Sequence, residues 1–337
     1  MSRASRYDRQ IRVASFGTEG QDRLLASRVA IIGVGALGSR VAEDLARSGV
    51  GYIRLVDRDF VELGNLHRQH LYDEHDAERE EPKVLAAAAR LSTINSDIEI
   101  DARLADLDAA QADALLDGVD LVIDGTDNFR TRYLVNDWSV REQRPWIYGA
   151  CVGTEAMAAA FLPGRACLRC MFPEPPPAES TATCETAGIL PPAVALATTL
   201  QTMLAFSVLT EPGSVPTKFY ACSTATGEIR SFDLPSQSAA ACPACALRTF
   251  PALDVDTAGD AQVLCGRNAV QLTTQSEHSL EALAERFRDH APELRKQMLR
   301  IDLPEGRITV FRGGRAIVQG TDDIARARAL FDRYIGD

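Results

Sequence analysis

The stretch that decides the fold is Val29-Ala-Ile-Ile-Gly-Val-Gly-Ala-Leu-Gly38, in which a short apolar run leads into the pattern Gly-x-Gly-x-x-Gly. An apolar run that stops at glycine is typical of a buried parallel strand. A helical pattern follows from Leu37 to Ser48. Glycines between a strand and a helix let the backbone approach a phosphate, and the helix N-terminus favours its negative charge. The pattern therefore predicts a nucleotide phosphate site at Gly33, Gly35 and Gly38.

The same alternation of strand and helix continues through the first half of the chain. Strands are expected at 52–56, 98–100, 121–123 and 146–148, and helices at 82–91 and 129–141. Strands that alternate with helices form parallel sheets covered on both faces. We therefore expect an α/β fold, a doubly wound and mostly parallel sheet with a Rossmann-like nucleotide site.

The second half is less regular and contains a change of composition. A Pro-rich stretch at 172–183 predicts a loop, an apolar helix is expected from Pro191, and strands are expected at 218–222 and 228–234. Beyond residues 249–259 we expect strands at 269–272, 307–311 and 315–318, the last two joined by Gly313-Gly314, and helices at 280–287 and 322–334. The predicted domains are residues 1–250 and a small α+β domain at 260–337.

Composition and charge exclude several classes of protein. The chain has 337 residues, 46% of them apolar, which is ordinary for a globular protein and excludes disorder. With 36 basic and 47 acidic residues the net charge is −11, which argues against binding nucleic acid through overall charge. The apolar stretch 193–209 is interrupted by Thr and Gln, so we expect a buried helix rather than a membrane span. No apolar segment follows the basic residues near Met1, so we expect a cytoplasmic protein with reduced cysteines.

The residues around the glycine pattern distinguish between kinds of nucleotide enzyme. Asp57 ends the second strand, where a carboxylate binds ribose hydroxyls, and by itself this indicates an NAD-dependent dehydrogenase. Arg68 and Lys83 would add two cations, which nucleotidyl transfer needs and hydride transfer does not. Asp127 follows another strand, where a carboxylate holds Mg²⁺. Taken singly, Arg68 and Lys83 also fit solvated surface charges, and Asp127 also fits a helix cap.

Several motifs in register make the sequence resemble a known family. They are Arg6-Tyr-Asp-Arg9-Gln10, the glycine pattern, Asp57-Arg-Asp59, Asn65-Leu-His-Arg68-Gln69, Lys83, Thr126-Asp-Asn128, two Cys-x-x-Cys pairs and Thr183-Cys-Glu-Thr-Ala-Gly188. Together they resemble the adenylyltransferases that activate ubiquitin-like sulfur carriers for molybdopterin or thiamine synthesis, which are relatives of ubiquitin-activating enzymes. The resemblance covers about residues 6 to 246.

This resemblance implies an activity and a set of site residues. The activity is ATP-dependent adenylation of the C-terminal Gly-Gly carboxylate of a sulfur-carrier protein, with release of pyrophosphate, before a thiocarboxylate is formed. Arg9 would reach the ATP of the partner subunit in a homodimer. Gly35, Ala36 and Gly38 would line the phosphates, Asp57 would bind ribose, and Asp127 would bind Mg²⁺. The residues expected along the phosphate chain or in the same motifs are Asp59, Asn65, Arg68, Gln69, Lys83 and Asn128.

The cysteines suggest a metal site and a nucleophile. Each of the pairs Cys167-Leu-Arg-Cys170 and Cys242-Pro-Ala-Cys245 offers two thiolates, and four thiolates make a closed tetrahedral zinc site. Independent redox pairs or buried thiols are the alternatives, and the family resemblance implies one zinc. Cys184 precedes the apolar helix and could accept the activated carrier, as the matching cysteine does in some members.

The remaining cysteines and the competing functions complete the expectations. Cys151 and Cys222 are expected in the core, and no role is assigned to Cys265 or to the C-terminal domain. The partners implied by resemblance are a carrier ending in Gly-Gly, a sulfur donor and a second copy of the chain, with no nucleic acid and no membrane. Two alternatives stay open: an NAD-dependent oxidoreductase, and a nucleotide-binding assembly protein without turnover. The sequence leaves the carrier, its pathway and the sulfur donor open.

Overall fold

The computed structural model of the chain divides into two compact units, residues 1–255 and 256–337. The structure describes residues 6–175, 184–236, 238–254, 261–264, 268–273, 278–295, 297–312 and 314–336. Cys265, Gly313 and most of the expected Pro-rich loop lie outside these residues.

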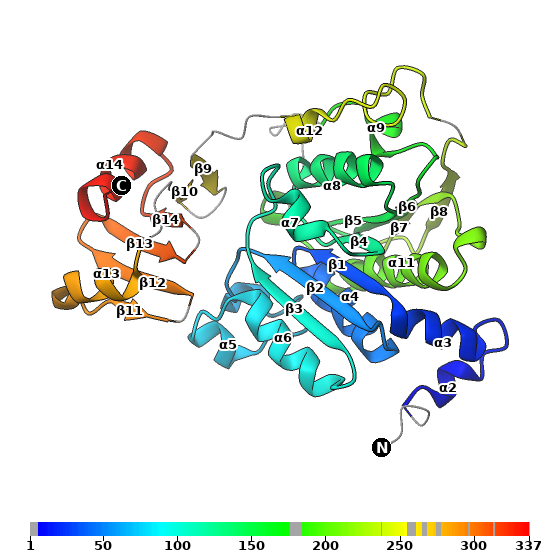
Figure 1. Ribbon diagram of the computed structural model, residues 1–337, viewed down its shortest axis with the longest axis horizontal. Coiled ribbons are helices and arrows are strands. Elements are labelled where there is room, and N and C mark those ends of the chain that lie inside the picture. Colours follow the sequence, from blue (N-terminus) through cyan, green and yellow to red (C-terminus); the bar gives the residue numbers. More distant parts are fainter. Residues whose placement is uncertain are drawn as a thin grey trace. The chain divides into compact units, whose positions relative to one another are not determined.

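The first unit is built on an eight-stranded sheet with the order β3-β2-β1-β4-β5-β6-β7-β8 (Figure 1). Five strands pair in parallel: β1 (Arg28–Ile32), β2 (Tyr52–Asp57), β3 (Glu99–Leu104), β4 (Leu121–Asp124) and β5 (Trp146–Val152). Three more pair antiparallel at the far edge: β6 (Glu155–Phe161), β7 (Lys218–Ser223) and β8 (Ile229–Asp233). The predicted α/β class is confirmed.

Strand β6 was not expected from the sequence, because four of its seven residues are alanine, which is depleted in strands. Tertiary packing explains it. The strand is paired on both sides, and its small side chains are buried, Ala156 and Ala158 completely. Small residues let the long helix α11 (Pro191–Thr210) pack closely against β5 and β6.

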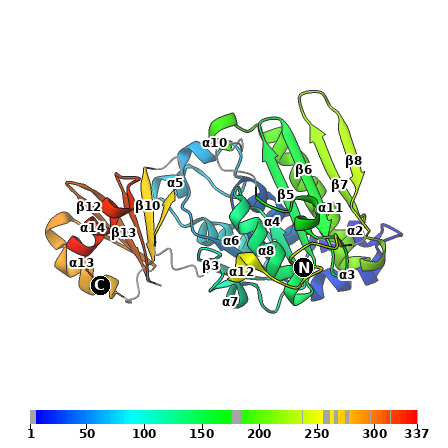
Figure 2. The same cartoon turned by 90° about the horizontal axis from the view of Figure 1, so that it is seen from above.

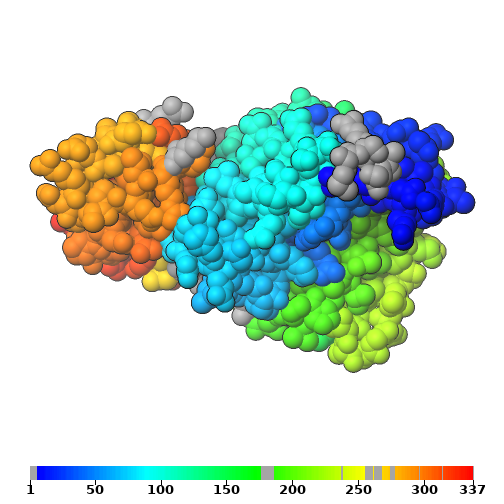
Figure 3. All heavy atoms as spheres, turned by 90° about the horizontal axis from the view of Figure 1, so that it is seen from below, coloured from blue at the N-terminus to red at the C-terminus, as the bar shows by residue number. Residues whose placement is uncertain are grey.

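Helices cover both faces of the sheet (Figure 2), and alternate strand residues bury against them. Ile31 and Leu55 face a core shared with α4 (Ala36–Ser48), α6 (Lys83–Ile94) and α11. Ile32 and Val56 face a second core with α7 (Ala112–Leu116) and α8 (Phe129–Glu142). The other short helices of this unit are α2 (Asp8–Ile11), α3 (Gly17–Ala26), α5 (Glu74–Glu78), α9 (Leu168–Met171), α10 (Cys184–Ala187), α12 (Pro251–Asp254) and the 3-10 turns Leu63–Asn65 and Pro212–Ser214. The cyan surface of Figure 3 is formed mainly by α5, α6 and β3.

Among the described residues, α11 is long and apolar enough to cross a membrane, judged by length and composition alone. Half of its most apolar window is buried inside the protein. Thr198 and Gln201 are fully buried, and Gln201 Nε2 donates to the carbonyl of Asp124 at 2.7 Å. These contacts are typical of a core helix, as the sequence predicted.

The second unit contains an antiparallel sheet with the order β11-β12-β13-β14-β10-β9. The strands are β9 (Ala261–Leu264), β10 (Ala269–Thr273), β11 (Glu293–Leu294), β12 (Met298–Leu303), β13 (Gly306–Phe311) and β14 (Arg315–Gln319). The helices are α13 (Leu280–Arg286), α14 (Ile324–Tyr334) and the 3-10 turn Arg288–His290. Helix α14 begins two residues later than expected, because the Asp323 side chain caps it by accepting from the N–H groups of Ala325 and Arg326.

Candidate nucleotide site and cysteine cluster

The candidate nucleotide site lies where the order of the parallel strands reverses. Strand β1 has β2 on one side and β4 on the other. In open α/β sheets, ligands bind outside the carboxyl ends of the strands at such a point. The glycine pattern follows β1, Asp57 ends β2, and the segment Asp124–Asn128 follows β4. The fold therefore brings three of the predicted motifs to one edge.

The three glycines of the loop have different structural roles. Gly33 has a φ of +81°, and a Cβ on it would lie 2.8 Å from the Gly125 carbonyl oxygen. A Cβ on Gly38 would lie 1.8 Å from the Gly33 carbonyl oxygen, which no side chain permits. Gly35 is different: a Cβ there would meet only Gln69 Nε2, at 3.7 Å. Gly33 and Gly38 thus shape the loop, while Gly35 leaves open space beside it.

The start of helix α4 suits a phosphate. Its N-cap is Gly35, and no side chain caps it. The N–H groups of a helix's first turn have no partners inside the helix, and their partial positive charge attracts anions. Gln69 is buried beside this loop, and its Oε1 has no hydrogen-bond partner among the described residues. The loop thus offers donors and space that fit the phosphates of a nucleotide.

Alanine substitutions are expected to separate the two kinds of glycine. Gly38→Ala forces a backbone overlap and should destabilise the first unit by about 1–3 kcal/mol or more. Gly35→Ala makes only ordinary contacts, so the thermal midpoint should stay near that of the wild type while the new methyl group weakens ATP binding at least tenfold. Thermal unfolding and ATP titration of both variants measure this. Equal ATP affinity of Gly35→Ala and the wild type would contradict the phosphate assignment.

Asp57 holds the loop in place. Its Oδ2 accepts from the Val34 N–H at 2.6 Å, and its Oδ1 accepts from the Asp59 N–H at 2.7 Å. Burial raises the pKa of Asp57, and the nearby charge of Lys83 opposes that rise. The Tyr72 hydroxyl, which sequence reasoning missed, donates to the Val34 carbonyl at 2.6 Å from the other side. The carboxylate therefore orders the phosphate loop, and its role toward a ribose stays a prediction.

The predicted cations lie on segments after β2. Lys83 is the first residue of α6 and only 4% exposed, and its Nζ lies 3.4 Å from Asp59 Oδ2. This burial rejects the interpretation of Lys83 as a solvated surface charge. Arg68 is half-buried, and its Nη2 donates to Asn65 Oδ1 at 2.7 Å. The Asn65 side chain therefore holds the guanidinium in a defined position.

The segment after β4 presents one exposed carboxylate over a buried ion pair. Asp127 is exposed, and the Asn128 side chain caps α8 by accepting from the Thr131 N–H at 2.9 Å. Beneath them, Arg132 Nε donates to Asp124 Oδ2 at 2.9 Å. Sequence analysis did not predict this ion pair. The signal that could have indicated it is Arg132 itself, a charged residue on the buried face of α8. The ion pair fixes the turn that carries Asp127.

Arg9 lies far from the nucleotide site of its own chain. Its helix α2 contacts the C-terminal end of α4, where Gln10 Nε2 donates to the Ser48 carbonyl at 3.0 Å. The glycine loop is at the other end of α4, about 20 Å away at 1.5 Å per residue. A role for Arg9 in a nucleotide site therefore requires a second copy of the chain.

The two Cys-x-x-Cys pairs come together, although 71 residues lie between Cys170 and Cys242 (242 − 170 − 1). Sγ–Sγ distances are 3.6 Å for Cys167–Cys242, 3.2 Å for Cys170–Cys245 and 4.0 Å for Cys167–Cys170. All four sulfur atoms lie within 4.8 Å of one another. Four thiolates at about 2.3 Å from a zinc ion lie about 3.8 Å apart, so this cluster fits a tetrahedral zinc site.

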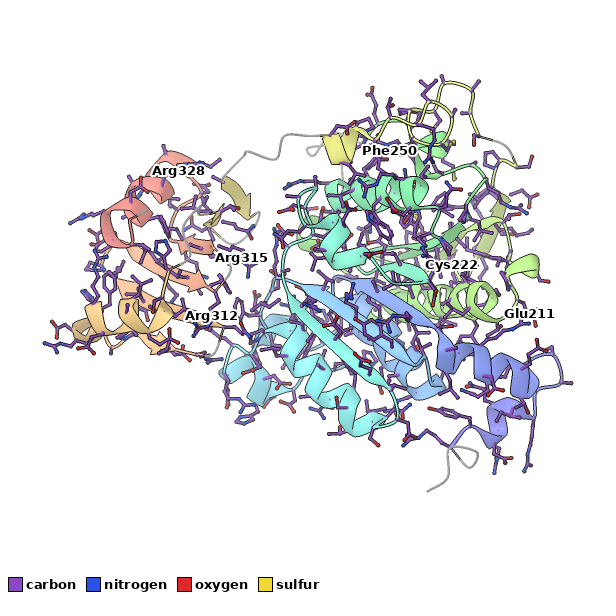
Figure 4. All side chains as sticks on the ribbon, in the orientation of Figure 1. Glu211, Cys222, Phe250, Arg312, Arg315 and Arg328 are labelled. Atoms are coloured by element: carbon purple, nitrogen blue, oxygen red, sulfur yellow. The ribbon has the colours of Figure 1, made fainter. Side chains whose placement is uncertain are left out.

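Packing holds the cluster against helix α8. Arg169, between the first two cysteines, makes a buried ion pair with Asp137, with an Nε–Oδ1 distance of 2.7 Å. Phe250, labelled in Figure 4, packs against the cysteines from the segment after the second pair. Burial raises the pKa of Cys170 to about 11. A bound cation would reverse this penalty by stabilising the thiolates.

The remaining cysteines separate into core and site positions. Cys151 and Cys222 are buried in one apolar cluster, which confirms the predicted core positions. Cys184 is the first residue of α10, and its side chain lies outside what the structure describes. The Gly188 carbonyl just beyond α10 accepts from the Gly153 N–H at 2.8 Å, past the carboxyl end of β5. The backbone thus places α10 at the same sheet edge as the glycine loop.

Comparison with known proteins agrees with this geometry. The ThiF family model matches residues 7–244. The sulfur carrier protein ThiS adenylyltransferase of Bacillus subtilis (strain 168) is 39% identical over 98% of this chain and 99% of its own length. The sulfur carrier protein adenylyltransferase of Thermus thermophilus is 40% identical over 55% of this chain and 69% of its own length.

A solved structure shares the fold. The crystal structure of Escherichia coli MccB with ATP superposes with a TM-score of 0.61 at 24% identity, covering 71% of this chain and 74% of that one. This likeness concerns the arrangement of the elements. Because the ThiF family model matches most of this chain, and because the Bacillus subtilis relative is 39% identical over 98% of it, the chain is a member of the ThiF family.

Proposed function

We propose that this protein adenylates the C-terminal Gly-Gly carboxylate of a ubiquitin-like sulfur-carrier protein of the ThiS type, using ATP and Mg²⁺. The observation that carries the proposal is the 39% identity, over nearly the full length of both chains, to a protein named as a ThiS adenylyltransferase. The site supports it, since the glycine loop, buried Lys83 and Arg68, which Asn65 holds, all follow the first two parallel strands.

The proposed reaction forms one bond and breaks one. An oxygen of the carrier carboxylate, ionised at neutral pH, attacks the α-phosphorus of ATP. The bond from that phosphorus to the bridging oxygen of the β-phosphate breaks, and pyrophosphate leaves with the electron pair. The N–H groups at the start of α4 would hold the phosphates, and Arg68 and Lys83 would stabilise the charge that develops on them. No general base is needed.

The other site residues have proposed supporting roles. Asp127 would hold Mg²⁺, which supplies charge neutralisation of the phosphates when bound. Asp57, Asp59, Gln69 and Asn128 would shape the nucleotide site. The four clustered cysteines would hold a structural zinc. The Cys184 thiolate would attack the acyl-adenylate carbonyl and release AMP, which leaves the carrier as a thioester for a sulfur donor to attack. We place the reaction in the cytoplasm.

The two alternatives are less well supported. An NAD-dependent oxidoreductase explains the glycine loop and Asp57 but leaves buried Lys83 and the four-cysteine cluster without purpose. An assembly protein without turnover would need no arginine held toward the phosphates. ATP-dependent release of pyrophosphate separates both from the proposal.

The test is ATP–pyrophosphate exchange with purified carriers ending in Gly-Gly from the thiamine and molybdopterin pathways. We expect exchange with the ThiS-type carrier and none with the same carrier lacking its last glycine. Exchange with a different carrier would replace the proposed substrate. Absence of exchange with every carrier, from folded zinc-loaded protein, would reject adenylation.

A complementation experiment tests the role of Arg9 in a homodimer. Arg9→Ala and Arg68→Ala should each be nearly inactive. In an equal mixture whose subunits exchange, half of the dimers are mixed, and each mixed dimer has one site with both arginines. The mixture should therefore recover about a quarter of the wild-type rate. If the mixture stays as inactive as its components while dimers have exchanged, Arg9 does not act across subunits.

A further inference from the structure

A cavity of about 350 Å³ lies next to the cysteine cluster, and none of the predicted nucleotide-site residues lines it. It is bordered by the end of α8, the start of β5, the turn after β6 and the segment of the second cysteine pair. The start of β5 is at the amino edge of the parallel strands, whereas the glycine loop is at their carboxyl edge. The cavity therefore belongs to a different site.

Three arginines line this cavity, and no acidic residue does. Arg144, Arg165 and Arg248 are all exposed. Within the described part of the chain, Arg144 and Arg165 make no ion pair, and Arg248 donates to the carbonyl groups of Val140 and Arg141. This gathering is unusual in a chain with a net charge of −11. Guanidinium groups bind carboxylate and phosphate oxygens through paired, charge-assisted hydrogen bonds, so this arrangement suits an anionic ligand.

The nearby acidic groups are engaged elsewhere. Asp113 and Glu142 are both paired with Arg141, with an Arg141 Nε–Glu142 Oε1 distance of 2.7 Å. Arg141 is on the last turn of α8 but does not line the cavity. No carboxylate lines the cavity, and the negative charge in its wall would come from Cys167 and Cys245 as zinc-bound thiolates.

The wall of the cavity adds two unused polar groups. Ser139 and Trp146 are each 1% exposed, and Ser139 Oγ and Trp146 Nε1 have no hydrogen-bond partner among the described residues. An indole N–H only donates, and a hydroxyl donates readily. Both atoms are shielded from solvent, so the three guanidinium groups are the donors that a ligand in the cavity can reach.

We propose that this cavity binds a diphosphate group, as free pyrophosphate or as part of a nucleotide. Its volume exceeds what a single phosphate fills, and three guanidinium groups match the two to three charges of a diphosphate. Such a ligand would bridge the α8–β5 turn, the turn before Cys167 and the segment after Cys245. It would thereby hold the cysteine cluster to the edge of the sheet. The proposal does not depend on the adenylation reaction.

Tryptophan fluorescence tests it directly, because the chain has only two tryptophans, Trp138 and Trp146. The full-length protein is titrated with inorganic phosphate, pyrophosphate and ADP at constant ionic strength. We expect a saturable change with pyrophosphate, which Trp146→Phe abolishes. The double variant Arg144→Gln/Arg165→Gln should bind at least tenfold more weakly, and both positions are exposed, so it should fold.

Matched variants locate the binding. Arg79→Gln, at an exposed position just after α5 and outside the cavity, should bind like the wild type. Equal responses to pyrophosphate and ADP would identify the diphosphate group as the ligand, and a response to ADP alone would identify a nucleotide. Unchanged affinity in the double variant, equally weakened binding in Arg79→Gln, or no saturable change with either diphosphate would overturn the proposal. If the double variant does not fold, the single variant Arg165→Gln, on an exposed turn, replaces it. It too should bind pyrophosphate at least tenfold more weakly than the wild type.

Discussion

Replacing Arg68 by alanine is expected to lower the rate of ATP–pyrophosphate exchange by about 100- to 1000-fold, the loss typical when one preorganised donor to a developing charge is removed. Arg68 is suited to this role because Asn65 Oδ1 and the Gly64 carbonyl accept from its two terminal nitrogens, at 2.7 and 3.2 Å. These contacts orient the guanidinium before the phosphates arrive, so the reaction does not have to order it.

The fold should survive this change. Arg68 is half-buried and belongs to neither apolar core, so the thermal midpoint of Arg68→Ala should stay within a few degrees of that of the wild type. Arg79→Ala is the matched control, since Arg79 is exposed and, among the described residues, pairs only with Asp76, at 3.9 Å. The control should exchange at the wild-type rate. Exchange by Arg68→Ala within threefold of the wild type would remove Arg68 from the mechanism.

The second large effect is expected from loss of zinc. A ligand present at a thousandfold its dissociation constant stabilises the folded state by about 4 kcal/mol. In a unit of about this size, that corresponds to a midpoint lowered by about 8–16 °C. Cys245→Ser removes one of four sulfur ligands, so the variant should be purified without zinc and should unfold at a correspondingly lower temperature. Metal analysis and thermal unfolding measure both effects.

A cysteine outside the cluster provides the control. Cys222 is buried in β7 within a separate apolar cluster, so Cys222→Ala should keep one zinc per chain and lose stability only through the small cavity it leaves. Wild-type protein that contains no metal after expression in zinc-supplemented medium would reject the zinc site. In that case the four thiols would be explained as buried groups or redox pairs.

The sequence predicted the elements whose patterns are strong. The strands β1, β2 and β4 and the helices α4 and α8 lie within one or two residues of their expected bounds, because apolar runs and helical periodicity are local signals. Strand β6 escaped prediction because its alanines have little preference for strands, and part of what holds it, its pairing with β7, comes from far away in the chain. Strand β12 also was not expected, although its apolar residues form part of the core of the second unit.

The candidate site shows the same difference between local sequence signals and contacts made by distant segments. The motifs alone predicted a phosphate loop, two cations and a carboxylate for a metal, since each residue type has a limited chemistry. Other features depend on contacts between segments, and only the tertiary structure decided them. They are the burial of Lys83, the ion pair of Arg132 with Asp124, and the hydrogen bond by which Asp57 holds the loop.

By itself, the sequence of this protein determined the class of fold, the family and the chemistry available, because these follow from local pattern and from residue type. The tertiary structure decided which residues act together. It brought the sulfur atoms of two distant cysteine pairs within 4.8 Å of one another, and it placed the helix of Arg9 at the end of α4 opposite the phosphate loop, about 20 Å away along that helix. It also gathered three arginines around the cavity next to the cysteine cluster. The physical reason is that distances between residues far apart in the chain are set by packing, which no local pattern records.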